Sequence, residues 1–330
     1  DWDREEESVL AVRRRKQRRG RSYAWRYRGR IVACVFVEVL IICALVIMVG
    51  WNKGVKEWFE QFEQPVLKEV DISGINSPNA ILMHARGGKV LGEINGDEKI
   101  YPASMTKIMT VILGIENFDD LDEKITLTDE MFAGLYEQDA TQAGFQPGEE
   151  VRVIDLLYGA MLPSGAECCI ALADTISGSE ADFAELMNKK AAKLGMDNTH
   201  FCDSTGLHNP DHYSTVKDIA VLMKYCIKND TFREIIETAR HSTGVTNIHP
   251  DGITYYSTMF KNLSDPTVTG GKILGGKTGY TSEAGHCLVS FAEIEGREYI
   301  FVSAGASGAD GNTIPHIQDA VTVYNRVGAA

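Results

Sequence analysis

An uninterrupted apolar run near the N-terminus is the feature that most limits what this chain can form. Residues 31–51, IVACVFVEVLIICALVIMVGW, contain one charged side chain, that of Glu38. As an α-helix these 21 residues would be roughly 31 Å long, which matches the hydrocarbon core of a bilayer. We therefore expect one transmembrane helix, with the rest of the chain divided between the two sides of a membrane.

The charges are distributed unevenly about this run. The chain has 33 basic and 46 acidic residues, yet the first 51 residues hold 11 of the basic and only 6 of the acidic ones. Because basic flanks stay on the cytoplasmic side, we expect the N-terminus in the cytoplasm and the acidic remainder outside. A nucleic-acid interface needs a basic face, so the acidic body argues against a nucleic-acid partner.

A cleaved signal peptide is the alternative interpretation of the apolar run. The run is long for a signal peptide, and its end lacks an A-x-A-like cleavage site, which favours an uncleaved single-pass anchor. The predicted organisation is a basic cytoplasmic arm (1–30), the anchor (31–51), a polar linker (52–75) and one extracytoplasmic domain (76–330).

Strands are predicted near both ends of the exported domain, with helices between them. Apolar segments at 80–86 and 89–94 flank a Gly-Gly turn, and segments at 286–294 and 298–306 flank a second turn. Apolar residues at nearly every position of 105–115 predict a helix buried on all sides. Further helices are expected over 154–161, 166–176, 180–194, 214–229 and 317–327. This order predicts an α+β domain with an antiparallel sheet assembled from both chain ends.

The segment YPASMTKIMT places Ser104 three residues before Lys107, at the start of the predicted central helix. Positions i and i+3 share a helix face, so the hydroxyl and the amine would project together. A partly desolvated lysine can accept the serine proton, which makes the hydroxyl a nucleophile without a histidine. Considered alone, these two residues fit a plain helix cap equally well, and a cap is the commoner use of such a serine.

Two further motifs follow in the chain. Ser164 lies in LPSGAE, in a break between predicted helices, and Lys277-Thr278-Gly279 lies in GGKTGYT, in a glycine-rich approach at the mouth of a predicted strand. The series S-x-x-K, S-x-N, K-T-G occurs in penicillin-recognising serine enzymes. With the flanking segments MLPSGAECCIALAD and LGMDNTHFCDSTGLHNPDHYSTVKDIAVLM, the chain from about residue 77 onward resembles the D-alanyl-D-alanine carboxypeptidases. These are low-molecular-mass penicillin-binding proteins of the S11 peptidase type.

The resemblance implies a β-lactamase/transpeptidase-like fold with a helical subdomain. It implies a serine-type carboxypeptidase that removes the terminal D-alanine from peptidoglycan stem pentapeptides, outside the bacterial cell membrane and without a cofactor or a metal. The expected partners are stem peptides ending in D-Ala-D-Ala, β-lactam antibiotics as covalent inhibitors, and the membrane through the N-terminal helix.

Site roles follow from the same resemblance. Ser104 becomes the acylated nucleophile and Lys107 its general base, while Ser164 would relay a proton toward the leaving amine. The backbone N–H groups of Ser104 and Tyr280 would bind the oxyanion. The terminal carboxylate of the substrate would be held by a cation and a hydroxyl donor. The expected substrate-binding residues are Lys277, Thr278, Gly279 and Tyr280.

One position departs from the family pattern. The second motif ordinarily ends in asparagine, and here the residue is Ala166. Loss of that amide removes two hydrogen bonds, at a cost on the order of a few kcal/mol unless ordered water or Glu167 replaces them. Two alternatives therefore stay open: a penicillin- or muropeptide-binding sensor with little turnover, and a β-lactamase, for which no loop supplies a convincing general-base glutamate.

Histidines, a cysteine and aspartates are crowded in residues 200–212, but their spacing matches no standard zinc site, so no metal is expected there. The five cysteines after the apolar run include the adjacent Cys168 and Cys169, which suit no regular disulfide framework. Most of them are interpreted as small buried hydrophobic residues.

Overall fold

The structure, a computed structural model, describes residues 67–263, 265–308 and 314–329. Residues from Lys68 onward form one compact unit. The predicted arm and anchor and most of the predicted linker lie outside the described residues, so these parts of the domain organisation stay predictions. Among the helices within the described ranges, none is both long enough and apolar enough to cross a membrane.

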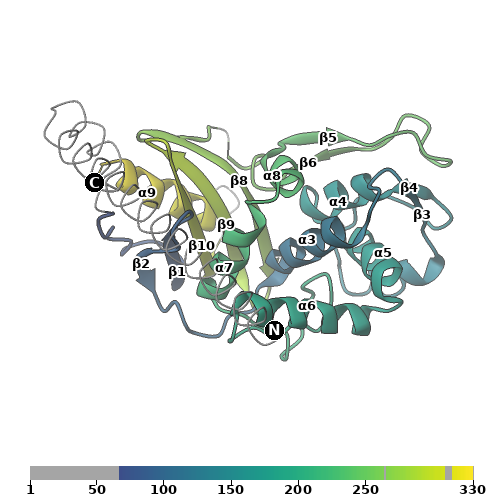
Figure 1. The fold of residues 1–330 in the computed structure, drawn as a ribbon, viewed down its shortest axis with the longest axis horizontal. Helices are drawn as coiled ribbons and strands as arrows, with labels where there is room; N and C mark the ends of the chain where they lie inside the picture. The colour runs from purple at the N-terminus through teal and green to yellow at the C-terminus, as the bar shows by residue number, and fades with distance from the viewer. Residues whose placement is uncertain (1–66, 264, 309–313, 330) are drawn as a thin grey trace, which may run out of the picture. The chain divides into compact units, whose positions relative to one another are not determined.

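A six-stranded antiparallel sheet organises the domain, in the strand order β2-β1-β10-β9-β8-β7 (Figure 1). The first strand pairs with the last, and Ile81 of β1 lies opposite Val302 of β10. The predicted sheet from both chain ends is thereby confirmed. Its strands are β1 (Asn79–His84), β2 (Val90–Ile94), β7 (Thr267–Val268), β8 (Gly271–Thr281), β9 (Gly285–Ile294) and β10 (Arg297–Ala306).

Helices cover both faces of this sheet. α9 (Pro315–Ala329) packs on β9 and β10, where the Tyr324 hydroxyl lies 3.0 Å from Ser290 Oγ and accepts a hydrogen bond from Phe301 N at 3.1 Å. α7 (Val216–Cys226) contacts the same two strands and β1. On β9, Ser290 meets α9, whereas its neighbours Val289 and Phe291 belong to the apolar core that also contains the buried residues of α7. Because successive strand residues point to opposite faces, the two helices lie on opposite faces of the sheet.

A group of helices stands beside the sheet (Figure 1). Its members are α3 (Lys107–Asn117), α4 (Val153–Met161), α5 (Ala166–Ser177) and α6 (Glu180–Leu194). Every residue of α3 from Lys107 to Gly114 is buried, which confirms the prediction of a central helix that is apolar all round. α6 begins after Ser179, whose Oγ accepts a hydrogen bond from Asp182 N, and ends at Gly195 with φ of 77°. The helix predicted over 180–194 is therefore confirmed with the same bounds.

Strands β7 and β8 of the sheet and two short ribbons were not predicted; the segment of β8 was expected to be a glycine-rich approach to the next strand. The ribbons are β3 (Lys124–Thr126) with β4 (Glu150–Arg152), and β5 (Arg240–Ser242) with β6 (Thr254–Tyr256). Strands of three residues are too short to give a readable alternation. The helix predicted over 214–229 was too long, because Asn229 caps a new helix, α8 (Asp230–Glu237), by accepting a hydrogen bond from Phe232 N. A one-turn 3₁₀ helix, η2 (Asp129–Phe132), lies between β3 and β4 in the chain.

Candidate active site

The first motif lies on a tight turn that leads into α3. Ser104 belongs to the 3₁₀ turn η1 (Ala103–Thr106), and Lys107 is the first residue of α3. The N-cap positions are Pro102 for η1 and Thr106 for α3, and neither helix has a side-chain cap. Ser104 is therefore not the cap of either helix, and its hydroxyl is left for Lys107.

Lys107 is almost completely buried, with 3% of its surface exposed. Its Nζ lies 3.0 Å from Ser104 Oγ and donates a hydrogen bond to the Thr205 carbonyl oxygen at 2.7 Å. Burial lowers the pKa of this amine, although the nearby Asp203 and Glu167 carboxylates oppose the effect. Because a deprotonated amine has a lone pair, Lys107 can take a proton from Ser104 at this distance.

The second and third motifs meet at a second lysine. Ser164 lies between α4 and α5 with φ of 72°, in the left-handed region that few residues other than glycine adopt. Its Oγ accepts a hydrogen bond from Lys277 Nζ at 3.0 Å. Lys277 is fully buried, and burial together with the nearby Lys107 amine holds its pKa well below the usual value. The site thus contains two neighbouring buried amines, each next to a serine hydroxyl.

Strand β8 lies directly against the turn that carries Ser104. A Cβ added at Gly279 would be 3.0 Å from Ser104 N and 3.2 Å from the Pro102 carbonyl oxygen. A residue with a side chain would push the strand away, so glycine allows this close approach. Tyr280 is the next residue along β8, and its side chain is 61% exposed beside the site.

Glu167 follows Ala166, the position at which the family's asparagine is missing, and one of its carboxylate oxygens is engaged elsewhere. Its Oε1 accepts hydrogen bonds from Ala143 N at 2.6 Å and Gly144 N at 2.9 Å, so the carboxylate holds a loop. Burial raises the pKa of this carboxyl group. The other oxygen of this carboxylate, Oε2, is buried without a hydrogen-bond partner among the described residues, so the possibility that Glu167 replaces part of the missing amide stays a prediction.

Two groups that contact the site residues lie outside the three sequence motifs. The Thr205 carbonyl oxygen contacts Lys107, and Thr258 Oγ1 lies 2.7 Å from Thr278 Oγ1. A backbone oxygen leaves no trace in residue type, and Thr258 lies in a loop without periodicity. The only available signal was the unusual density of polar residues in CDSTGLHNPDH, which surrounds Thr205.

The histidines and aspartates crowded in residues 200–212 contact other protein groups. Asp203 Oδ2 lies 3.2 Å from His212 Nδ1, and the His208 ring packs edge-on against Tyr101. His200 Nδ1 lies 2.7 Å from the Asp211 carbonyl oxygen. Within the described ranges, no group of three or more His, Cys, Asp or Glu side chains is arranged to hold a metal ion.

The cysteines of the described chain are free thiols. Four of them are completely buried, as the sequence predicted for most: Cys168, Cys169, Cys226 and Cys287. Burial raises the pKa of each, so none is a thiolate nucleophile at neutral pH.

The sheet built from both chain ends, the helices beside it and the buried Ser-Lys pair define a transpeptidase-like serine acyl-transfer domain. The crystal structure of the Streptomyces K15 DD-transpeptidase has the same fold, with a TM-score of 0.70 at 29% identity, over 79% of this chain and 100% of that chain. The model of peptidase family S11, D-alanyl-D-alanine carboxypeptidase, matches residues 66–308. This chain belongs to that family.

Curated relatives agree with this assignment. D-alanyl-D-alanine carboxypeptidase DacF of Bacillus subtilis is 36% identical over 231 residues, which cover 69% of this chain and 57% of that protein. D-alanyl-D-alanine carboxypeptidase DacC of Escherichia coli is 35% identical over 262 residues, which cover 72% of this chain and 58% of that protein. The chain thus spans a little over half the length of these two relatives.

Proposed function

We propose that this chain is a serine-type D-Ala-D-Ala carboxypeptidase that removes the terminal D-alanine from peptidoglycan stem pentapeptides and is acylated by penicillin. The observation that carries the proposal is the buried Lys107 amine, 3.0 Å from Ser104 Oγ, in a member of the S11 family. The names of the curated relatives support the same reaction.

In the acylation step, Ser104 Oγ forms a bond to the carbonyl carbon of the penultimate D-alanine, and its proton passes to Lys107 Nζ. The amide C–N bond then breaks, and the proton that Lys107 took from Ser104 passes through Ser164 Oγ to the leaving amine, which returns Lys107 to its neutral form for deacylation; Lys277 holds Ser164 in place by a hydrogen bond. The backbone N–H groups of Ser104 and Tyr280 bind the oxyanion, each contributing about 3 to 4 kcal/mol. The approach of Gly279 to Ser104 N supports this pairing.

Substrate binding and deacylation use the same groups. Lys277 and Thr278 hold the terminal carboxylate, with Gly279 and Tyr280 continuing the strand beside the peptide. Water then attacks the Ser104 ester, with Lys107 as the base, and releases the shortened peptide. We further propose that residues 31–51 anchor the enzyme in the bacterial membrane with the catalytic domain outside.

The test uses the purified chain in detergent, with fluorescent penicillin and a D-Ala-D-Ala peptide. We expect covalent labelling and D-alanine release in the wild type, and neither in Ser104→Ala. Ser242→Ala, on an exposed strand of the β5–β6 ribbon, is the matched control and should retain both. Labelling that survives in Ser104→Ala would refute the assignment.

A penicillin-binding sensor is the second candidate, and one observation favours it. Ala166 replaces the amide of the second motif, and Glu167 is turned toward Ala143 and Gly144 instead. A site that acylates without this amide could release the acyl group slowly. Labelling without D-alanine release would support the sensor, and rapid penicillin hydrolysis would support a β-lactamase instead.

A further inference from the structure

The Thr205 carbonyl oxygen is a partner of Lys107 that none of the three motifs supplies. At 2.7 Å it is closer to Lys107 Nζ than Ser104 Oγ is, at 3.0 Å. An amine that donates one N–H to a fixed oxygen has fewer orientations available. The Thr205 oxygen therefore helps to orient the rest of the Lys107 amine, including its lone pair when it is neutral, toward Ser104 Oγ. The groups that hold the Thr205 oxygen in place therefore influence the position of the Lys107 amine.

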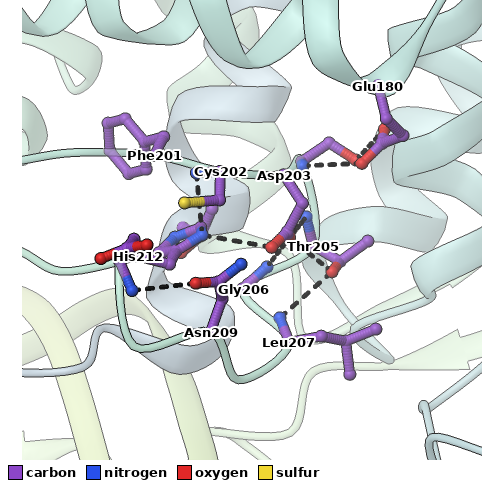
Figure 2. A network of polar contacts seen from close by, with 12 residues as sticks. Glu180, Phe201, Cys202, Asp203, Thr205, Gly206, Leu207, Asn209 and His212 are labelled. Carbon is purple, nitrogen blue, oxygen red and sulfur yellow. Dashed lines mark hydrogen bonds and ion pairs between the residues drawn. The ribbon is translucent and has the colours of Figure 1, made fainter.

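The oxygen belongs to residues 203–207, here called the Asp203 loop (Figure 2). One carboxylate oxygen, Asp203 Oδ1, accepts three hydrogen bonds from the loop: from Thr205 N at 2.8 Å, Thr205 Oγ1 at 2.7 Å and Gly206 N at 2.7 Å. The Thr205 hydroxyl in turn accepts a hydrogen bond from Leu207 N at 3.1 Å. Asp203 thus holds three donors of the loop, while the Glu180 carboxylate separately accepts hydrogen bonds from Ser204 N at 3.0 Å and Ser204 Oγ at 2.7 Å (Figure 2).

The other oxygen of this carboxylate reaches a histidine that leads back to α3. His212 Nδ1 lies 3.2 Å from Asp203 Oδ2, to which it donates when it carries a proton, and 3.2 Å from Cys202 N, from which it accepts when it does not; Figure 2 draws both contacts. His212 Nε2 lies 2.9 Å from the hydroxyl of Thr106, the residue before Lys107. The imidazole therefore links the Asp203 loop to the backbone that carries the base.

The loop also touches the turn that carries the nucleophile. Gly206 has φ of 79°, and a Cβ added there would lie 1.9 Å from the Ala103 carbonyl oxygen. Ala103 precedes Ser104 and itself has φ of 46°. One loop thus contacts both the turn of Ser104 and the amine of Lys107.

We propose that Asp203 and His212 are a positioning pair for the reaction proposed above: they fix the Asp203 loop, so that the Thr205 oxygen holds the Lys107 amine at Ser104. This inference rests on the proposed function. Neither residue touches the substrate in this role, and both act through Lys107.

The charge of Asp203 gives the pair a measurable signature. Lys107 faces Lys277 from β8, Glu167 and the thiols of Cys168 and Cys169 from α5, and Asp203 from the loop. The negative charge of Asp203 raises the pKa of Lys107, opposing the larger effect of burial. Neutralising Asp203 therefore lowers this pKa, and acylation, which needs the neutral amine, should reach its plateau at a lower pH.

Two substitutions separate the geometry from the charge. Asp203→Asn keeps an oxygen for the loop hydrogen bonds and removes the charge, so the acylation rate at the plateau should fall by less than about tenfold, with the rising limb moved to lower pH. Asp203→Ala removes the loop hydrogen bonds as well, and a misplaced base should cost about a hundredfold in acylation by fluorescent penicillin. Asp211→Asn removes an exposed carboxylate from the same stretch. It should change neither the plateau rate of acylation nor the pH at which that rate rises.

A double variant tests whether the two residues act as one unit. His212→Gln should slow acylation by itself, and adding it to Asp203→Ala should cause little further loss, because the loop is already released. If the acylation rate of the double variant falls by the product of the two single-variant losses, His212 acts independently of Asp203, and the positioning pair is overturned. Circular dichroism melts confirm that each variant is folded.

A measurement without substrate keeps this inference apart from the proposed function. NMR titration of the Lys107 side chain in the full chain should show a lower pKa in Asp203→Asn than in the wild type, and no change in Asp211→Asn. If the wild type is not labelled by penicillin, the proposed function fails, while the titration still decides whether Asp203 sets the base. The inference is overturned by an unmoved pKa in Asp203→Asn, or by a folded Asp203→Ala that is acylated within about threefold of the wild-type rate.

Discussion

Replacing Gly279 with alanine tests whether the contact between β8 and η1 sets the geometry of the oxyanion site. The added Cβ would lie 3.0 Å from Ser104 N, 3.1 Å from Ala103 Cβ and 3.2 Å from the Pro102 carbonyl oxygen. Favourable separations are about 3.5–4.0 Å, so the strand and the turn must part by about 0.5 Å. None of these atoms is the end of a flexible side chain, so the backbone itself has to move.

The expected cost has two parts. Overpacking of this kind destabilises a fold by about 1–3 kcal/mol. A misplacement of about 1 Å can cost a hundredfold in rate, so a shift of half that size should slow acylation by about tenfold. The assay is the second-order rate constant for fluorescent penicillin, with a melting curve for each protein.

A matched control separates the site from the general effect of a glycine replacement. Gly87 lies in the turn between β1 and β2, where a Cβ would meet only His84 Nδ1, at 3.6 Å. Gly87→Ala should therefore be acylated at the wild-type rate. If Gly279→Ala is folded and also reacts at the wild-type rate, the close approach of β8 does not position the oxyanion donors, and the reasoning is refuted.

Three further outcomes are expected. Ala166→Asn should raise D-alanine release roughly fivefold if one amide hydrogen bond of about 1 kcal/mol is restored, and an unchanged or lower rate would mean that the site compensates otherwise. Tyr324→Phe leaves the Phe301 N–H without its acceptor, so denaturant melts should show a loss of about 1–2 kcal/mol while penicillin labelling of folded protein is unchanged. The hydrogen bonds and charge around Asp203 outweigh its burial and lower its pKa to about 2, below the 3.8 of the unfolded chain. Its contribution of roughly 2 kcal/mol is therefore present above pH ~4 and is lost as pH falls toward ~2, and urea melts should show no such loss in Asp203→Asn.

Long periodic segments made most of the fold predictable. The apolar segments at 80–94 and 286–306 predicted β1, β2, β9 and β10, and the all-round apolar segment at 105–115 predicted the central helix, because these patterns can be read from the local sequence. Strand β8 was missed, because its glycines hide the alternation. The ribbons β3–β4 and β5–β6 were missed, since three-residue strands are held by neighbouring loops rather than by their own pattern. The overlong helix over 214–229 failed for a related reason: Asn229 was not recognised as a cap.

The site was predictable only where it consists of side chains in fixed motifs. Ser104 and Lys107 could be found because their spacing is local, and Ser164 and Lys277 because their order is characteristic. The Thr205 oxygen could not be found, because the loop that presents it is wound around Asp203 by contacts with no periodic signal. The same contacts pair the polar side chains of this crowded stretch with one another, as Asp203 with His212.

The two buried amines predict that substrate binding itself sets the charge of the base. Lys277 and Lys107 are both buried, and charge on Lys107 disfavours charge on Lys277, so the reverse holds by reciprocity. A substrate carboxylate bound at Lys277 would favour the charged form of that amine and thereby the neutral form of Lys107, which accepts the Ser104 proton. An amide analogue of the peptide, without the carboxylate, should therefore show a kcat that rises at a higher pH than kcat for the acid. Superimposable kcat profiles for the two peptides would show that the lysines do not communicate in this way.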